Sequence, residues 1–119
     1  MELVESEIGW TPFTLQQWDY CYQRFRKNVD LREDSPVYRL SSNMFNEHAH
    51  ATFMDDYCGS HMLKIWGKDN CICSSDYPHG NVTRTKSRAF IAKQIYDLDY
   101  GTQEKLTSKN VMDLYDLKI

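Results

Sequence analysis

The sequence predicts an α/β fold in which parallel strands alternate with helices. Three short runs rich in apolar residues have the length of strands, and apolar residues recur at helical spacing between and after them. Strands separated by helices of this length are typical of parallel βαβ units. We therefore expect one parallel sheet with a helix between each strand and the next.

The first unit begins with a short strand at residues 3–5, after which the chain turns at Gly9. Thr11 is a suitable N-cap, and Pro12 fits the first helical position because its φ is already fixed near the helical value. Apolar residues then recur at helical spacing and predict an amphipathic helix over residues 12–28: Leu15, Trp18, Tyr22 and Phe25.

The second unit follows a polar stretch, residues 29–47, which contains Pro36 and is expected to be a long connection. Residues 49–54 fit a second strand, and one of the two aspartates that follow starts a helix. Gly67 is the expected end of that helix, whose apolar residues are Met62, Leu63, Ile65 and Trp66.

The third unit begins with a strand at residues 71–75 that ends at Asp76. The segment after it contains Pro and Gly, which break both helices and strands, and is therefore a loop. Ser87 can cap the next helix, which carries apolar residues at 90, 91 and 95. Thr102 can cap a last short helix, which Asn110 interrupts.

Composition and charge exclude several classes of protein. With 41% hydrophobic and 13% aromatic residues, the chain is too apolar for a disordered tail. Its net charge of −3 argues against binding nucleic acid through phosphate neutralisation. No apolar run approaches the roughly 18 residues that would suggest a membrane span. We expect neither a nucleic-acid partner nor a membrane.

The cellular compartment is inferred from the N-terminus and the cysteines. The first ten residues lack the basic stretch and apolar core of a signal peptide. Two of the four cysteines, Cys71 and Cys73, lie two residues apart in a strand-like run, where their side chains would point the same way, and such near neighbours rarely form a disulfide. We expect reduced thiols and a cytoplasmic protein.

Three βα units are too few to form a complete domain of this kind. A three-stranded parallel sheet leaves two open edges and half a core. A complete eight-unit barrel needs roughly 250 residues, whereas the sequence has 119. We therefore expect that another chain completes the sheet or that the sequence is a fragment.

Four short motifs, in order along the chain, carry a resemblance to a known family. Residues 5–13 read ESEIGWTPF, residues 51–56 read ATFMDD, and residues 74–79 read SSDYPH; Asn110 then precedes a Leu-Tyr pair at 114–115. Together they resemble the amidohydrolase-related family of metal-dependent (β/α)8 barrels, in the branch that holds the aminocarboxymuconate-semialdehyde and resorcylate-type decarboxylases. The resemblance covers nearly the whole chain.

The resemblance implies that residues 1–119 are the C-terminal portion of a single barrel domain, roughly its last three βα units. The implied function is hydrolysis or non-oxidative decarboxylation of a small carboxylate or amide substrate, with a divalent metal, expected to be zinc. The family's His-x-His motif and its fifth-strand His would lie upstream of Met1, so we expect the chain to be inactive alone. After His79, relatives often have Trp-Pro, whereas Arg84 and Thr85 stand here.

Three residues are candidates for the site. Asp76 ends a strand, and the C-terminal ends of barrel strands form the mouth where barrel chemistry takes place. The resemblance implies that Asp76 is a metal ligand and helps to orient or deprotonate a metal-bound water. It implies that His79 contacts substrate or braces its loop, and that Glu5 contacts substrate or the metal-bound water. The competing interpretations are a turn-opening Asp, an exposed loop His and a strand-end charge.

Two further patterns resemble metal sites. His48 and His50 form a His-x-His pair, but it lies at the N-terminal side of the second strand, away from the expected mouth. A Cys/His pattern superficially resembles a zinc module, but its spacing matches no common zinc frame, and buried thiols explain it better. Its residues are Cys58, His61, Cys71 and Cys73.

Three functional classes remain open. The first is a metal-dependent hydrolase or decarboxylase of which this chain is a part. The second is a non-catalytic remnant, or a subunit that completes or binds another barrel, so that the partner is the missing barrel portion or a second copy. The third is a small zinc-binding interaction module.

Overall fold

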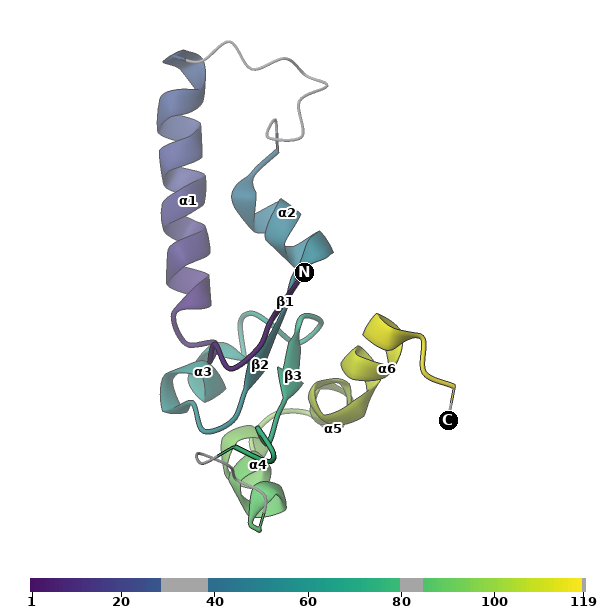
Figure 1. The fold of residues 1–119 in the computed structure, drawn as a ribbon. Coiled ribbons are helices and arrows are strands. Elements are labelled where there is room, and N and C mark those ends of the chain that lie inside the picture. Colours follow the sequence, from purple (N-terminus) through teal and green to yellow (C-terminus); the bar gives the residue numbers. More distant parts are fainter. Residues whose placement is uncertain (29–38, 80–84, 119) are drawn as a thin grey trace.

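The computed structural model describes residues 1–28, 39–79 and 85–118. In this part of the chain, β1 (Glu2–Leu3), β2 (His50–Phe53) and β3 (Cys71–Cys73) form one parallel sheet in the order β1-β2-β3 (Figure 1). The register pairs Leu3 with Ala51 and Ala51 with Cys71. The predicted α/β class, with parallel strands and alternating helices, is confirmed.

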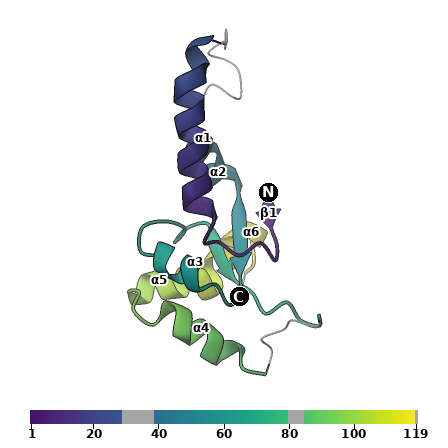
Figure 2. The same cartoon turned by 90° about the vertical axis from the view of Figure 1, so that its left-hand side faces the viewer.

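The first connection contains two helices. Helix α1 (Thr11–Phe25) continues into a 3-10 turn (Arg26–Asn28), and α2 (Ser41–His48) leads directly into β2. Figures 1 and 2 show α1 extending beyond the N-terminal end of the sheet. Helix α2 lies beside the lower half of α1.

The predicted polar connection, residues 29–47, was wrong over residues 41–47, which belong to α2. The Ser42 N–H donates to Asp19 Oδ1 of α1 at 2.9 Å, and Phe45 is buried against Leu15. The acceptor at the start of α2 and the residue against which its buried face packs therefore both belong to α1. The local sequence of α2 does not reveal either contact. Residues 29–38 lie outside the described part of the chain.

The later helices follow the second and third strands. Helix α3 (Tyr57–Met62) comes after β2, and α4 (Ser87–Ile95) follows the loop after β3. The chain then stays helical through α5 (Tyr100–Glu104), a π-helical segment (Lys105–Lys109) and α6 (Asn110–Tyr115). None of the helices in the described ranges is long and apolar enough to cross a membrane.

Several predicted helix boundaries need correction. Thr11 was predicted as the N-cap of α1 but is its first helical residue. Its side chain is fully buried and its hydroxyl has no hydrogen-bond partner among the described residues, so Thr11 serves in packing and not as a cap. Lys86, and not Ser87, is the N-cap of α4. Thr102 lies inside α5, which is capped by Asp99.

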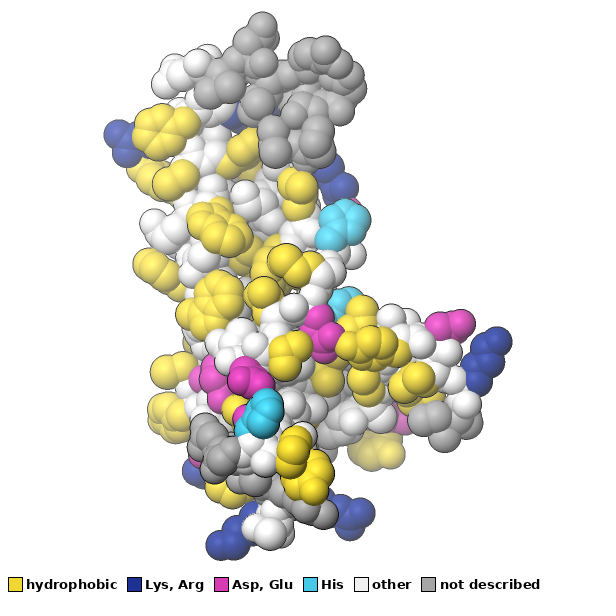
Figure 3. All heavy atoms as spheres, in the orientation of Figure 1, with side chains coloured by type: hydrophobic (Ala, Val, Ile, Leu, Met, Phe, Trp, Pro, Cys, Tyr) yellow, Lys and Arg dark blue, Asp and Glu magenta, His cyan; other side chains and the backbone are white. Residues whose placement is uncertain are grey.

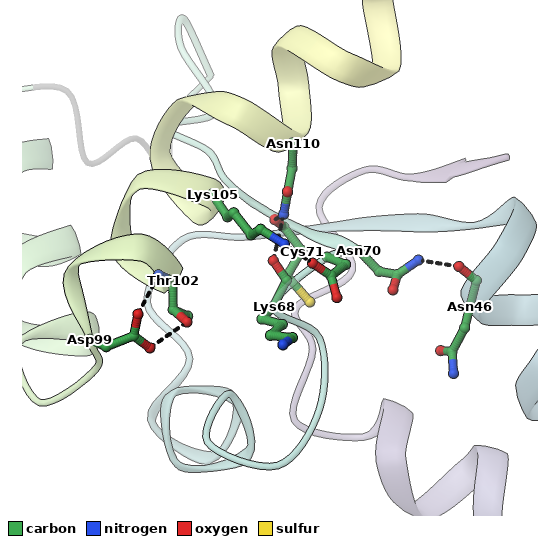
Figure 4. A network of polar contacts seen from close by, with 9 residues as sticks. Asn46, Lys68, Asn70, Cys71, Asp99, Thr102, Lys105 and Asn110 are labelled. Atoms are coloured by element: carbon green, nitrogen blue, oxygen red, sulfur yellow. Dashed lines mark hydrogen bonds and ion pairs between the residues drawn. The ribbon is translucent and has the colours of Figure 1, made fainter.

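Asn110 does not interrupt the last helix, because its side chain bonds outside the helix. Its Nδ2 group donates to the carbonyl oxygens of Lys68 (2.9 Å) and Cys71 (2.8 Å) (Figure 4). Asn70 makes similar bonds to the carbonyl oxygens of Asn46 (2.7 Å) and Ala49 (2.9 Å). These two carboxamides join α2, β2, β3 and α6 at the N-terminal end of the sheet.

Two clusters of buried side chains form the core. One cluster of buried side chains joins the strands to the helices that follow them: Ile8, Ala51, Phe53, Leu63, Cys71, Ile95 and Leu106. A smaller cluster joins α1, α2 and the start of β2: Leu15, Phe45 and Ala49. The core therefore holds the C-terminal ends of the strands, where the candidate site lies, against α3 and α4.

Candidate functional site

The three predicted site residues lie together at the C-terminal edge of the sheet. Glu5 follows β1, and Asp76 and His79 follow β3. One ligand atom of each lies within 4.8 Å of those of the other two, and no other such cluster of three His, Cys, Asp or Glu is found among the described residues. His79 Nδ1 lies 2.9 Å from Asp76 Oδ1 and 3.6 Å from Glu5 Oε1.

Backbone geometry directs the two carboxylates of this cluster. Glu5 and Asp76 both adopt left-handed conformations, with φ of 56° and 52°. This conformation costs an L-residue about 1–2 kcal/mol, so surrounding contacts must maintain it. The His79 N–H donates to the Asp76 carbonyl oxygen at 2.9 Å, which closes a tight turn. The turn brings the imidazole back over the Asp76 carboxylate.

The three side chains differ in their access to solvent. The Asp76 side chain is 10% exposed, whereas those of Glu5 and His79 are 50% and 67% exposed. Asp76 therefore lies at the base of the cluster, and Glu5 and His79 form its rim. A small molecule approaching the sheet edge meets the rim before it reaches the Asp76 carboxylate.

Glu7 lies two residues after Glu5 but has a different environment. Its carboxylate accepts hydrogen bonds from the backbone N–H groups of Met54 (3.1 Å) and Asp55 (3.5 Å). It therefore binds the end of β2, while Glu5 faces Asp76 and His79. Alternation along an extended strand does not explain this arrangement, because both residues are left-handed.

The donor set is chemically suited to a divalent cation. Two carboxylates and one imidazole match the nitrogen and oxygen ligands that zinc and other first-row metals accept. Three protein donors also leave positions for water or substrate, as in catalytic zinc sites. The residues present therefore fit the metal that the family resemblance implies.

The His-x-His pair and the Cys/His pattern, which resembled metal sites in the sequence, do not have the geometry of the Glu5, Asp76 and His79 cluster. His48 ends α2 and is exposed, while His50 begins β2, so the pair does not share one strand face. Cys58 is exposed on α3, and Cys71 is completely buried in β3. Burial raises the pKa of both Cys71 and Cys73 to about 12, so both are neutral thiols near neutral pH.

Sequence reasoning missed the residues that support the cluster. Thr52, on β2, accepts a hydrogen bond from the Glu5 N–H at 3.0 Å. Asp56 accepts bonds from the segment after Glu5, and Gln94 of α4 binds the Asp56 N–H. The sequence placed Asp56 in the 51–56 motif and as a possible helix start, but gave it no supporting role, and nothing in the sequence distinguishes Gln94 from a surface glutamine.

Comparison with known proteins gives an informative structural similarity. No family model matches the chain, and no sufficiently similar curated protein was found. Among solved structures, 2,6-dihydroxybenzoate decarboxylase in complex with 2,6-dihydroxybenzoate matches with a TM-score of 0.59 at 21% sequence identity. The match covers 89% of this chain and 31% of that one.

This similarity supports the fold. The chain spans about a third of the length of the decarboxylase that it matches. That protein is a TIM barrel, and the three parallel strands and alternating helices of this chain correspond to a part of it. The chain therefore has the α/β architecture of a partial (β/α)8 barrel.

Proposed function

We propose that this chain supplies part of the catalytic mouth of a metal-dependent barrel enzyme of the amidohydrolase-related type. The observation that carries the proposal is the convergence of Glu5, Asp76 and His79 at the C-terminal edge of a parallel sheet. Barrel enzymes place their chemistry at this edge. The structural similarity to a decarboxylase and the sequence motifs support the same class.

In this proposal, Asp76 is the metal ligand, because it is the least exposed of the three carboxylate and imidazole groups. A bound divalent cation, zinc for preference, would lower the pKa of a coordinated water and polarise a carbonyl or carboxylate group. Glu5 and His79, on the rim, can bind substrate or exchange a proton with it. The substrate class is a small carboxylate or amide, and the reaction is hydrolysis or non-oxidative decarboxylation.

The proposal includes further strands that complete the barrel, either in a longer polypeptide or as a second chain. A catalytic site of this type uses three or more firm protein ligands, and Asp76 is the one with the strongest basis here. We place the protein in the cytoplasm, where its free thiols stay reduced.

The test compares two proteins, the 119-residue chain and a barrel completed with the remaining strands. Metal content and turnover of small aromatic carboxylates, including 2,6-dihydroxybenzoate, and of amides are measured for both. We expect weak metal binding and no turnover by the chain alone, and both properties in the completed barrel. Robust turnover by the 119-residue chain would contradict the requirement for further strands.

Substitution then tests the role of Asp76. In the completed barrel, Asp76→Asn keeps the shape of the side chain but removes its charge, and should abolish turnover. Asp69→Asn is the matched control, because Asp69 is a surface carboxylate paired with Lys105. Full activity of the Asp76→Asn barrel would refute the proposed role.

A second candidate function is a non-catalytic subunit that completes or binds another barrel. The large apolar side chains exposed on α1 favour it, because such a surface suits a protein contact. The same two-protein comparison distinguishes this function. A completed barrel that is stable but neither binds metal nor turns over substrate would support the subunit.

A further inference from the structure

The segment between β1 and α1 follows an unfavourable path. Glu5 and Glu7 are both left-handed, with φ of 56° and 49°. Neither is a glycine, so each costs about 1–2 kcal/mol relative to an ordinary conformation. Such conformations persist only where the surrounding structure enforces them. The contacts that hold this segment therefore determine where Glu5 lies.

The Asp56 carboxylate provides the strongest of these contacts. Its Oδ2 atom accepts hydrogen bonds from the N–H groups of Ile8 (2.6 Å) and Gly9 (2.7 Å). Its Oδ1 atom accepts one from the Gly59 N–H at 2.7 Å, which caps α3. One side chain thus binds the loop after β1 and the helix after β2. Hydrogen bonds to a carboxylate are stronger than those between neutral groups.

Close packing fixes the loop against this carboxylate. A Cβ atom on Gly59 would lie 2.4 Å from Asp56 Oδ2 and 2.5 Å from Ile8 Cγ1. A Cβ atom on Gly9 would lie 2.7 Å from Cys58 Cβ. The loop can approach Asp56 this closely because both positions lack a side chain. Ile8, whose Cγ1 atom packs against Gly59, is completely buried.

A side chain of the third βα unit, Gln94, holds Asp56 in place by a hydrogen bond. Its N–H donates to Gln94 Oε1 of α4 at 2.7 Å, and Gln94 Nε2 donates to the Met54 carbonyl oxygen at 2.5 Å. Gln94 is only 5% exposed. Since α4 follows the loop that carries Asp76 and His79, the contacts connect all three strand ends.

Glu5 depends on this backbone arrangement for its position. Its N–H donates to Thr52 Oγ1, and its half-exposed side chain makes one long contact, 3.6 Å, to His79. These contacts would not prevent a side chain on a relaxed loop from moving away from the cluster. The loop anchored at Asp56 limits that movement.

We propose that Asp56 is a positioning residue that holds Glu5 beside Asp76 and His79 by anchoring the left-handed segment after β1. The importance of this role rests on the proposed function, in which Asp76 holds the metal and Glu5 and His79 act beside it. Asp56 itself lies behind the loop and acts through it.

The test uses Asp56→Asn in the isotope-labelled full chain. Asparagine caps helices as well as aspartate does, so its carbonyl oxygen can keep the bond to Gly59. Its NH2 group then faces the N–H groups of Ile8 and Gly9 and cannot accept from them. Asp55→Asn is the matched control, since it removes the same charge from an exposed neighbour.

The primary measurement is paramagnetic broadening of side-chain NMR signals by Mn²⁺ alone. In the wild-type chain and in Asp55→Asn, we expect Glu5, Asp76 and His79 to broaden together. In Asp56→Asn, broadening of Glu5 should fall several-fold while that of Asp76 persists. Equal broadening of Glu5 in Asp56→Asn and wild type would overturn the inference.

A second measurement separates this inference from the proposed function. Residues with positive φ give strong NOEs between their own amide and Hα protons, whether or not metal is bound. If Mn²⁺ broadens none of the three residues in wild type, the proposed metal site fails. Weaker NOEs of this kind at Glu5 and Glu7 in Asp56→Asn would still support the anchor, and unchanged NOEs would refute it.

Discussion

Single side chains hold the two ends of the sheet in different ways. At the N-terminal end, the carboxamides of Asn70 and Asn110 satisfy backbone carbonyl groups of neighbouring segments (Figure 4). At the C-terminal end, the carboxylates of Glu7 and Asp56 accept bonds from backbone N–H groups. Residues at the C-terminal end of a barrel carry the chemistry, and those at the other end contribute stability.

Substitution of Asn110 by alanine should therefore reduce stability. The buried side chain makes two hydrogen bonds, and their loss leaves the carbonyl oxygens of Lys68 and Cys71 without these donors. An unsatisfied buried group costs about 1–3 kcal/mol. Urea unfolding followed by circular dichroism should show a lower midpoint for Asn110→Ala. Asn43→Ala, at an exposed position of α2, is the control, and an equal effect of the two would contradict the prediction.

The cysteines should differ in reactivity and give the protein a pH dependence. Near pH 7.5, an alkylating reagent should modify the exposed Cys21 and Cys58, while Cys71 and Cys73 react only after unfolding. The thiolate is the reactive form, and burial raises the pKa of Cys71 and Cys73 to about 12. Mass spectrometry of the labelled peptides measures this, and rapid modification of Cys71 in the native chain would refute it.

The same thiols should lower stability at high pH. In the unfolded chain these cysteines ionise near pH 9, whereas in the folded chain they stay neutral up to about pH 12. The contribution is therefore complete below pH 9 and is lost as the pH rises from 9 towards 12, by about 1.4 kcal/mol per pH unit for one thiol. The urea midpoint of Cys71→Ala should fall less steeply over this range, and parallel profiles would contradict the assignment.

At the scale of helices and strands, the sequence predicted what local periodicity determines. The apolar stripe from Leu15 to Phe25 predicted α1, and the apolar runs predicted the three strands. Helix α2 was missed because Asp19 of α1 caps it and Leu15 packs against it. The continuous helix from Tyr100 to Tyr115 was missed because the Asn110 side chain bonds to the sheet instead of breaking the helix.

The same distinction applies to the candidate site. Parallel strands bring their C-terminal ends to one edge, so the proximity of Glu5 to Asp76 could be expected from the topology. Topology does not choose between Glu5 and Glu7, because that choice depends on left-handed conformations and on backbone groups of β2; the family resemblance alone pointed to Glu5. Asp56 and Gln94 connect three separate segments, and a contact of that kind leaves no local pattern.

The turn between α3 and β3 allows a test at the level of an element. Gly67 has a φ of 93°, and an added Cβ would lie 2.6 Å from Cys71 Sγ. Gly67→Ala should therefore lower the free energy of unfolding by at least about 1–2 kcal/mol, the usual cost of a left-handed L-residue. Adding Cys71→Ala should relieve the clash but not the backbone strain.

Gly101→Ala is the matched control for this turn. Gly101 lies in α5, where alanine gains up to about 1 kcal/mol of helix propensity, although Asp99 Oδ1 would lie 3.2 Å from the new Cβ. We expect its urea midpoint to stay near that of wild type or to rise. If Gly67→Ala behaved in the same way as Gly101→Ala, the strained turn would be refuted.

The whole molecule is more extended than a typical domain of its length. Its radius of gyration is 16.3 Å and its principal extents are 53 × 31 × 31 Å, whereas a compact domain of 119 residues has a radius of about 13–14 Å. Hydrophobic side chains lie exposed along α1 (Figure 3), including Phe13, Trp18, Tyr20 and Phe25. Such a surface is expected to be covered when the sheet is completed.

This surface leads to a prediction about cooperativity. The sheet has open edges, and its core is covered on only some sides. Its parts therefore share few contacts, and unfolding of one part need not unfold the others, so unfolding should have low cooperativity. The isolated 119-residue chain should therefore give a mixed α/β circular dichroism spectrum and a broad urea transition. It should also bind a hydrophobic dye such as ANS, because contiguous apolar surface faces solvent.

The completed barrel is the reference protein for these measurements. Its added strands pair with the open edges and cover apolar surface, so dye binding should decrease and the urea transition should become sharper. The association state is measured in parallel by sedimentation, because a dimer of the isolated chain would also cover the exposed face of α1. A sharp two-state transition of a monomeric 119-residue chain, without dye binding, would show that its core is self-sufficient and would contradict the need for further strands.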